Sequence, residues 1–373
     1  MLLCGLVVAP LQAAPGEREN RGEQLRGLSS ESEAKIETSI PGFLANKKIN
    51  PDRSANDLGW DCLAAGALVE AGNAGAADKL TVVAEQMLQQ AVRSRKGDKP
   101  IGWSSSIAGR PACVRAERGG DGNGRGQGRD DDRGGIGSCD GTDITYAFQT
   151  GLGIACLSRA STLLNRPDFL EAAQSAFAYW DRQRLKAPPC KDCIFYATSD
   201  SAADSRLYVR NMNVFMAFGA ASLAQATKDE RYADAARKAM RSDVWERGQG
   251  NRGYLSKLDP LWSSRANEAE RIENHSASVA LLSVKIGRML HSDELVAHGL
   301  TVWRDWATCD NDRCRKAGCK YWAGDAQQCQ ATGTAAHCAF RQDDPLAAAQ
   351  CNQYLSRVPR VPGYGIWAAS LEK

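Results

Sequence analysis

Four ionisable side chains, at two places in the sequence, are of the types that perform acid–base chemistry. Asp140 and Asp143 lie just before one apolar stretch, and Glu273 and His275 lie at the start of another. Two carboxylates can divide the roles of general acid and general base, and an imidazole can take either role near neutral pH. We therefore single out these four residues as candidate catalytic groups.

Further polar and aromatic residues lie before or at the start of apolar stretches, and Trp103 lies in a loop between two of these stretches. Amide, guanidinium, phenol and carboxylate groups can bind a polar ligand, and an indole ring can stack on an apolar ligand face. We expect neither a metal nor an organic cofactor beside them. The candidate ligand-binding residues are Trp60, Asp61, Trp103, Tyr146, Asp204, Arg206, Asn213 and Asn274.

A structural role would also explain several of these residues. An acidic side chain near a helix N-terminus is stabilised by the helix dipole and by free backbone N–H groups, so Asp143, Asp204 and Glu273 need no further reason. His275 precedes an apolar helix and fits a hydrogen-bonded structural histidine better than a catalytic base, because the sequence identifies no partner for it. The remaining histidines are expected in surface or loop positions: His291, His298 and His337.

Motifs of several common enzyme classes are missing from the sequence. It contains no G-x-S-x-G elbow, no P-loop and no H-E-x-x-H. Residues 121–132 begin like an EF-hand loop, but Arg125 replaces a ligand and Asp132 replaces the bidentate glutamate. Gly151 and Gly153 lie within a predicted helix with no strand before it, so they favour close helix packing over dinucleotide binding.

The elements that must position the candidate residues are helices of two kinds. Residues 144–164 are apolar on nearly every side, which is typical of a helix that is buried all round. Residues 168–180 carry a one-sided apolar stripe, which is typical of a helix that covers a core. The sequence therefore predicts an inner helix followed by an outer one.

The same pairing recurs along the chain. An earlier pair lies within residues 58–92, and later inner and outer helices are predicted at 207–223 with 229–245 and at 274–290 with 293–306. A capping box predicts that one outer helix starts at Thr227, and Ser292 is the expected N-cap of the next. Equivalent alanines, Ala172, Ala235 and Ala297, are spaced by 63 and 62 residues. This near-constant period indicates an array of helical hairpins.

An array of this kind can close into a ring whose inner helices begin at one mouth. With long loops between its hairpins, the chain resembles over residues 58–306 the α/α-toroid class, the incomplete (α/α)6 barrels of many glycoside hydrolases, polysaccharide lyases and sugar epimerases. The resemblance implies an all-α fold with small β-hairpins in its loops. It also implies that the polar clusters before the inner helices converge on one pocket.

The resemblance further implies an oligosaccharide or polysaccharide as ligand. For hydrolysis, Asp140 or Asp143 would pair with Glu273, and the separation of the two carboxylates would select inversion or retention. The indole rings of Trp60, Trp103 and Trp262 would offer stacking faces for sugar rings.

Lyase chemistry would assign the roles differently. A base such as His275 or Tyr146 would remove a proton, and Arg206 or Asn213 would neutralise the uronate carboxylate. A non-catalytic helical-repeat protein that binds a glycan or a protein on its concave face is the alternative from another functional class.

Cysteine usage points to an oxidising compartment. The sequence has 13 cysteines, of which six crowd the C-terminal tail, and residues 1–14 fit the apolar core and cleavage site of a signal peptide. We therefore expect structural disulfides and a periplasmic or secreted location. Cys190 and Cys193 form a C-x-x-C pair, but zinc would need a second pair and a thioredoxin-like motif a βαβ context, so a structural disulfide is expected there too.

Charge and composition limit the remaining possibilities. A net charge of +3 with well-mixed signs gives no electrostatic case for nucleic acid, and the apolar run at 2–10 is too short to insert across a membrane. We expect a toroid domain at 15–306 that begins with a mobile arm at 15–35 and carries a flexible insertion at 115–137. A cysteine-rich extension should follow at 307–373. The sequence leaves the oligomeric state open.

Overall fold

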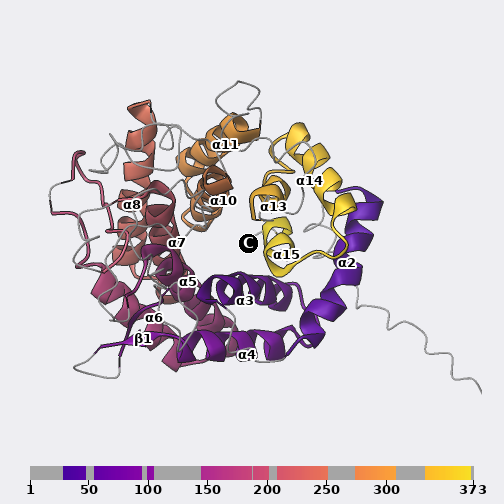
Figure 1. Cartoon of the computed structure of the whole chain (residues 1–373), viewed down its shortest axis with the longest axis horizontal. Coiled ribbons are helices and arrows are strands. Elements are labelled where there is room, and N and C mark those ends of the chain that lie inside the picture. The colour runs from indigo at the N-terminus through magenta and orange to yellow at the C-terminus, as the bar shows by residue number, and fades with distance from the viewer. Residues whose placement is uncertain are drawn as a thin grey trace, which may run out of the picture.

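The computed structural model describes residues 28–47, 54–94, 99–104, 144–186, 188–200, 208–250, 274–307 and 332–370. Within these ranges twelve helices form two concentric layers around a common axis (Figure 1). The inner helices are α3 (Ala55–Glu70), α5 (Ala147–Leu164), α7 (Arg210–Thr227), α10 (Asn274–Met289), α13 (Thr332–Ala339) and α15 (Gly363–Ala369). The fold is the α/α toroid that the sequence predicts.

The outer helices alternate with the inner ones along the chain. They are α2 (Ser30–Ala45), α4 (Ala76–Gln89), α6 (Pro167–Trp180), α8 (Glu230–Gly248), α11 (Asp293–Ala307) and α14 (Pro345–Arg357). The turns that lead from an inner to an outer helix are short. The connections from an outer helix to the next inner helix are mostly longer, and all of them arrive at the N-terminal ends of the inner helices.

Burial distinguishes the two layers as the sequence patterns predict. In α7 the consecutive residues Val214, Phe215, Met216 and Ala217 are all fully buried, which requires cover on every side of the helix. In α4 the buried residues instead recur at helical spacing along one face: Leu80, Val83, Ala84 and Met87. The difference places one kind of helix inside the ring and the other at its surface.

Glycines allow the inner helices to approach closely. A Cβ atom on Gly151 of α5 would overlap the carbonyl of Phe215 on α7, and one on Gly153 would overlap the indole of Trp103. Gly219 of α7 returns the contact, because a Cβ there would lie 2.9 Å from the carbonyl oxygen of Gly151. The expected role in close helix packing is confirmed for Gly151, whereas Gly153 makes room for the Trp103 ring, which lies outside any helix.

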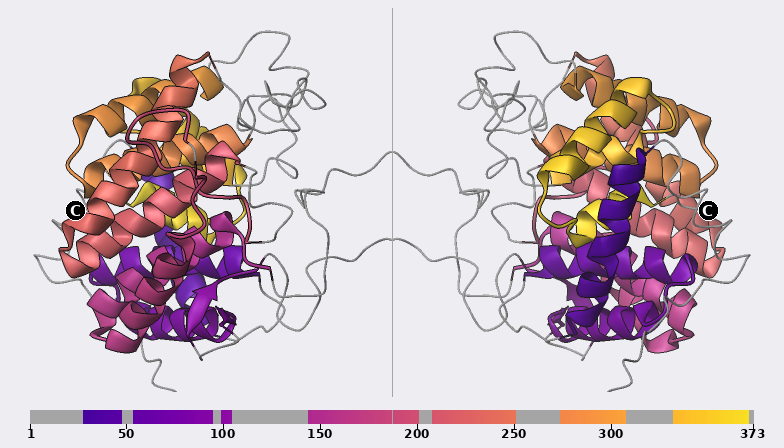
Figure 2. Two further views of the ribbon diagram at one scale, coloured as in Figure 1. Left: turned by 90° about the vertical axis from the view of Figure 1, so that its left-hand side faces the viewer. Right: turned by 90° about the vertical axis from the view of Figure 1, so that its right-hand side faces the viewer.

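The C-terminal part of the chain completes the ring. Helix α13 packs on α10, and α15 packs on both α13 and α3, so the last inner helix meets the first. Residues 332–370, which the sequence analysis separated from the toroid, supply two inner helices and one outer helix. On the outside, α14 packs on α2, as the right-hand view of Figure 2 shows for the yellow and indigo helices.

Two details differ from the sequence-based expectations at helix starts. The arm expected at 15–35 overlaps α2, which begins at Ser30 and is capped by the Ser29 side chain. The outer helix α8 does not start at Thr227, where α7 ends; Asp229 is its N-cap and accepts from the Arg231 N–H. Asp229 is the N-cap instead of Thr227 because its carboxylate accepts a hydrogen bond from a free backbone N–H of the first turn.

The N-cap role of Ser292 is confirmed by its contact with the Leu295 N–H at 3.4 Å.

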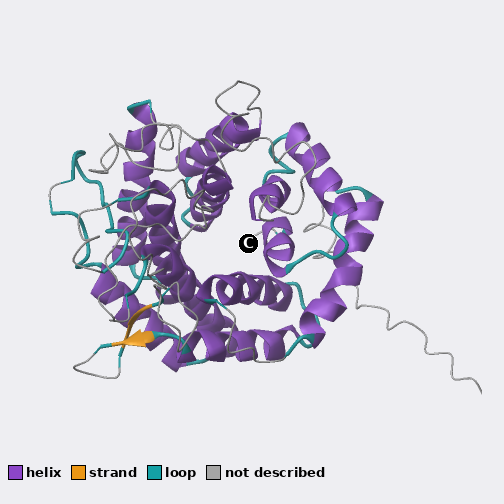
Figure 3. Ribbon diagram, in the orientation of Figure 1, coloured by secondary structure: helices purple, strands orange, loops and turns teal. Residues whose placement is uncertain are grey.

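Strands are few in the described part of the chain. The strands β1 (Val92–Arg93) and β2 (Pro100–Gly102) form one antiparallel pair at the edge of the ring, drawn in orange in Figure 3. They lie in the connection between α4 and α5, as expected for a β-hairpin in a toroid loop. None of the described helices combines the length and apolarity needed to cross a membrane.

Three disulfides are present among the described residues. Cys62–Cys156 joins the inner helices α3 and α5, and Cys338–Cys351 joins α13 to α14. All four of these cysteines are fully buried. The third disulfide, Cys190–Cys193, closes a short loop after α6.

Candidate functional site

The N-terminal ends of α5 and α7 are held together by one loop, residues 194–200, which we call the rim loop. The Ala147 N–H at the start of α5 donates to the Thr198 carbonyl at 3.0 Å, and the Thr145 N–H donates to the Asp200 carboxylate at 2.8 Å. The Tyr196 N–H donates to the Asn213 side chain of α7 at 2.9 Å. The rim loop therefore fixes the relative position of two inner-helix starts.

Tyr146, the N-cap residue of α5, lies at this rim. Its backbone N–H donates to the Trp103 carbonyl at 3.0 Å, and it pairs with Ser199 of the rim loop in an isolated β-bridge. The residue is half-buried. Tyr146 thus stands at the predicted mouth with part of its surface open.

Asn213 serves the protein rather than an incoming ligand. Its side-chain N–H groups lie within hydrogen-bond distance of the Ile194 carbonyl, the Ala239 carbonyl and the Ser242 hydroxyl, at 3.2, 3.0 and 2.7 Å, and its oxygen accepts from Tyr196. The residue is fully buried. A uronate-binding role for Asn213 is corrected here, because its amide already ties α7 to α8 and to the rim loop.

Trp103 is likewise a core residue and not a stacking face. Its indole N–H donates to the Met87 carbonyl at 2.8 Å, its backbone N–H donates to the Thr150 hydroxyl at 3.1 Å, and no part of it is exposed. The ring fills the space that Gly153 leaves on α5. The sequence-based role for Trp103 is therefore wrong, since a buried ring has no free face for a ligand.

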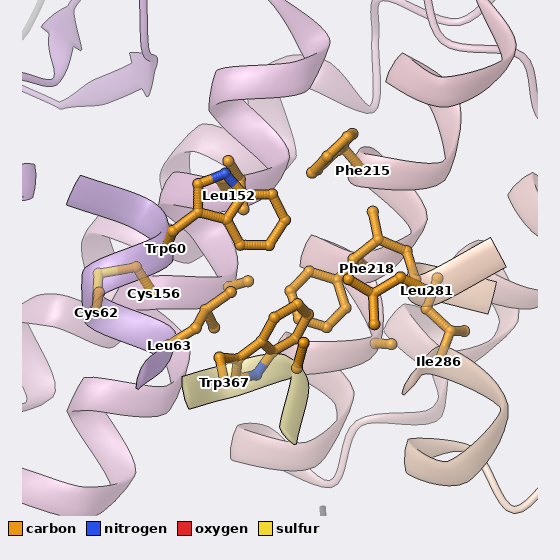
Figure 4. Close-up of a cluster of buried hydrophobic side chains, with 14 of the residues drawn as sticks. Trp60, Cys62, Leu63, Leu152, Cys156, Phe215, Phe218, Leu281, Ile286 and Trp367 are labelled. Atoms are coloured by element: carbon orange, nitrogen blue, oxygen red, sulfur yellow. A yellow bond between two sulfur atoms is a disulfide. The ribbon is translucent and has the colours of Figure 1, made fainter. Parts of the chain in front are cut away.

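Trp60 lies in an aromatic cluster that crosses the interior of the ring (Figure 4). Its ring centroid is 5.9 Å from that of Phe215 and 5.4 Å from that of Trp367, and Phe218 is 5.6 Å from Trp367. Phe148, which is half-buried at the start of α5, lies 4.2 Å from Phe215. Trp60 is 5% exposed, so its contribution is to packing among α3, α7 and α15 rather than to ligand stacking.

The Asp61 side chain points away from Trp60, toward α4 and α15. Its carboxylate lies 4.0 Å from the Lys79 ammonium on α4 and against Gly363 at the start of α15, where a Cβ atom would overlap it. The side chain is 14% exposed. This position gives Asp61 a structural contact among three helices, α3, α4 and α15.

The structure also assembles a buried ionic cluster that the sequence analysis missed. Arg210, at the start of α7, donates to Asp243 of α8 at 2.8 Å, and His298 of α11 contacts the other Asp243 oxygen at 2.6 Å. Burial by itself would raise the pKa of Asp243, but Arg210 and His298 reverse this and hold it well below its usual range. Burial raises the pKa of the neighbouring Tyr208 above 10.

Two histidines that were expected at the surface are buried. His298 belongs to the ionic cluster, with its side chain 7% exposed. His337 is fully buried, stacks on Trp306 with ring centroids 4.9 Å apart, and accepts a hydrogen bond from the Trp303 indole at 3.1 Å. No sequence signal marked their partners, since Asp243, Trp303 and Trp306 are each far away along the chain.

The four candidate catalytic residues are only partly covered by the described residues. Asn274 and His275 are the first two residues of α10, so their backbone lies at the rim, while their side chains are outside the described part. Three candidate catalytic residues and three candidate ligand-binding residues lie wholly outside the described ranges: Asp140, Asp143 and Glu273, and Asp204, Arg206 and Trp262. Their convergence at the rim stays a prediction. No group of metal-ligating side chains occurs within the described ranges.

Comparison with known proteins gives likeness in structure only. No protein-family profile matches the sequence, and no curated protein matches it. A crystal structure of D-mannose isomerase matches with a TM-score of 0.56 at 12% identity, over 88% of this chain and 85% of that one. The cellobiose 2-epimerase of Spirochaeta thermophila DSM 6192 matches with 0.53 at 11%, over 93% and 86%.

A third solved structure, a sugar epimerase from a ruminal bacterium, matches with a TM-score of 0.53 at 10% identity, over 90% of this chain and 85% of that one. At these identities the matches show the fold alone. Because they span most of both chains, they confirm the toroid as the architecture of the described part of this chain.

Proposed function

We propose that this protein is a carbohydrate-active enzyme that works at the rim where its inner helices begin. The observation that carries the proposal is the likeness of the ring to three sugar isomerases and epimerases over at least 85% of each of those chains. The candidate acids and bases support it, because they precede or begin inner helices in the sequence. The disulfides support an exported protein acting in the periplasm or outside the cell.

Isomerisation or epimerisation of a reducing sugar is the first candidate reaction. Such a reaction removes a proton from the carbon beside the sugar carbonyl and returns one, so it needs a base and an acid near the same carbon. His275 and Glu273 are adjacent to the first turn of α10 and have the required types. Arg206, just before α7, would stabilise the oxyanion that develops.

Glycosidic cleavage is the second candidate, favoured by the three carboxylates Asp140, Asp143 and Glu273. In hydrolysis one of them would protonate the leaving oxygen while another activates water or attacks the sugar. In a lyase, His275 or Tyr146 would take the proton beside a uronate, with Arg206 on the carboxylate. A glycan-binding scaffold without catalysis is the alternative from another class.

One assay separates these possibilities. The oxidised protein is incubated in deuterium oxide with mannose, cellobiose, neutral oligosaccharides and uronate oligosaccharides, and the products are followed by NMR. Deuterium at the carbon beside the carbonyl, together with a new sugar isomer, would support the first candidate. New reducing ends or unsaturated uronates would support cleavage instead. Binding without turnover would support the scaffold, and neither binding nor turnover would overturn the proposal.

Two variants link any activity to the rim. His275→Asn and Glu273→Gln should each lower kcat by about 10²- to 10⁴-fold, which is the usual contribution of a general acid or base. His291→Asn is the matched control, since His291 is exposed in the turn after α10 at a positive φ of 51° that asparagine tolerates. Equal activity in all three variants would remove these residues from the mechanism.

A further inference from the structure

The Cys190–Cys193 disulfide differs from the other two disulfides in exposure. Cys190 is half-buried, and its neighbours Pro189, Lys191 and Asp192 are exposed. The other two disulfides have no exposed surface on any cysteine. Cys190 is therefore the most accessible of these six cysteines, and a thiol in solution can approach it while the fold is intact, whereas Cys62–Cys156 and Cys338–Cys351 require the helices to open.

The loop that the disulfide closes is also short. Cys190 and Cys193 are separated by 3 positions, compared with 94 for Cys62–Cys156 and 13 for Cys338–Cys351. A disulfide that closes so few residues restricts the unfolded chain little. Its contribution to global stability is the smallest of the three, so the fold would survive its reduction.

The disulfide is packed directly against the rim. Cys193, Phe195 and Tyr208 form a small buried cluster, with Cys190 and Trp245 against it. The Phe195 ring lies 4.6 Å from Tyr208, just before α7, and 6.3 Å from Trp245 on α8. Phe195 belongs to the rim loop, so a change at the disulfide reaches the rim loop through this cluster.

We propose that Cys190–Cys193 is a thiol–disulfide exchange site that accepts electrons from a dithiol partner. One partner thiolate attacks the Cys190 sulfur, a mixed disulfide forms, and Cys193 leaves as a thiolate that takes up a proton. The second partner thiol then attacks the mixed disulfide and releases Cys190. The partner ends as a disulfide, and two electrons and two protons reach the protein. Reduction loosens the rim loop without opening the ring.

The first test is selective reduction of the native, oxidised full-length protein. Dithiothreitol is raised in steps, free thiols are alkylated, and each cysteine peptide is quantified by mass spectrometry. Cys190 and Cys193 should be half-alkylated at a dithiothreitol concentration at least tenfold below that needed for Cys62, Cys156, Cys338 and Cys351. Simultaneous labelling of all six cysteines would overturn the proposal.

The second test reads the rim loop. Backbone hydrogen exchange in residues 194–200 should accelerate after selective reduction, and the Cys190→Ser/Cys193→Ser double variant should reproduce that rate without any reductant. Exchange in α3, α5 and α7 should stay unchanged in both. Unchanged exchange in the rim loop after complete reduction of this pair would overturn the coupling, and the double variant excludes an effect of dithiothreitol on other cysteines.

Discussion

At the scale of single residues, two buried ionisable groups of this ring show how neighbouring side chains set their charge. Asp243 carries a negative charge in a fully buried position because Arg210 and His298 surround its two oxygens. A buried charge is tolerated only with such compensation. His337 is also buried but carries no charge. Its Nδ1 accepts a hydrogen bond from the Trp303 indole, so the imidazole is neutral with its proton on Nε2.

The neutral state of His337 predicts a pH dependence of stability. Burial lowers the pKa of His337 to about 3, whereas an unfolded histidine titrates near 6.5. Below about pH 6.5 the imidazole is protonated in the unfolded chain but stays neutral in the folded chain. The contribution of His337 to the free energy of unfolding therefore falls by about 1.4 kcal/mol per pH unit. It is complete above that pH and is lost as the pH decreases toward 3.

The measurement compares urea unfolding of the wild-type protein and of His337→Phe from pH 7.5 to pH 4. Below about pH 6.5, the difference in unfolding free energy between the wild type and His337→Phe should decrease by about 1.4 kcal/mol per pH unit. Parallel curves for wild type and His337→Phe would contradict a neutral, buried His337.

The residue scale is also where the sequence was least informative. Polar residues before an inner helix can turn toward the bore, toward the outer layer or into a loop contact, and the periodicity does not distinguish these directions. The side chains of Asn213 and Asp61 contact neighbouring helices, and the Trp103 ring packs against Gly153 of α5. Only tertiary contacts decide the direction, so these roles could not be predicted from residue type and position.

At the scale of elements, helix character was predictable wherever apolar residues were dense. The two patterns of α5 with α6 and of α7 with α8 are long and regular, so their existence and their inner or outer place follow from the sequence. Helix α2 was missed because its sequence is charged and contains Pro41. Helices α13 and α15 were missed because they are 8 and 7 residues long, too short for a period to stand out.

The contact between α5 and α7 gives a prediction at this scale. Gly151→Ala should destabilise the protein by about 1–3 kcal/mol, because the added methyl group would push the Phe215 carbonyl and force the two inner helices apart. Gly248→Ala is the matched control, since nothing lies within 4 Å of its Cβ position at the end of α8. That control should be neutral or slightly stabilising.

Urea unfolding of both glycine variants at neutral pH provides the measurement. A Gly151→Ala protein as stable as the wild type would mean that α5 and α7 are not in the close contact described. A second check is available at the interface itself, because slower or unchanged hydrogen exchange in α7 would contradict a forced separation.

At the scale of the whole molecule, the ring is closed by contacts between distant parts of the chain. Trp367 of α15 is fully buried against Trp60 of α3 and Phe218 of α7. Lys285 of α10 adds a hydrogen bond to the Ser370 carbonyl at 2.9 Å, and its ammonium lies 4.9 Å from the Trp367 ring centroid. These contacts tie α15 to α3, α7 and α10.

Removal of the Trp367 side chain should therefore weaken ring closure. Trp367→Ala should cost about 3–5 kcal/mol of unfolding free energy, as large aromatic truncations in cores do. Hydrogen exchange should accelerate first in α15 and in the facing half of α3. Leu346→Ala, at a residue 41% exposed on α14, should change stability by less than about 0.5 kcal/mol. Equal effects of the two substitutions would contradict this account of the ring.

The closure of the ring also has a consequence for how the chain is made. Of the described helices, α2 leaves the ribosome first and α15 last, yet α15 must pack between α3 and α13. The part of Trp60 that Trp367 covers therefore stays uncovered from the synthesis of α3 until α15 emerges. A growing chain of this kind exposes an apolar face for longest at its oldest part, which is the condition under which co-translational chaperones bind.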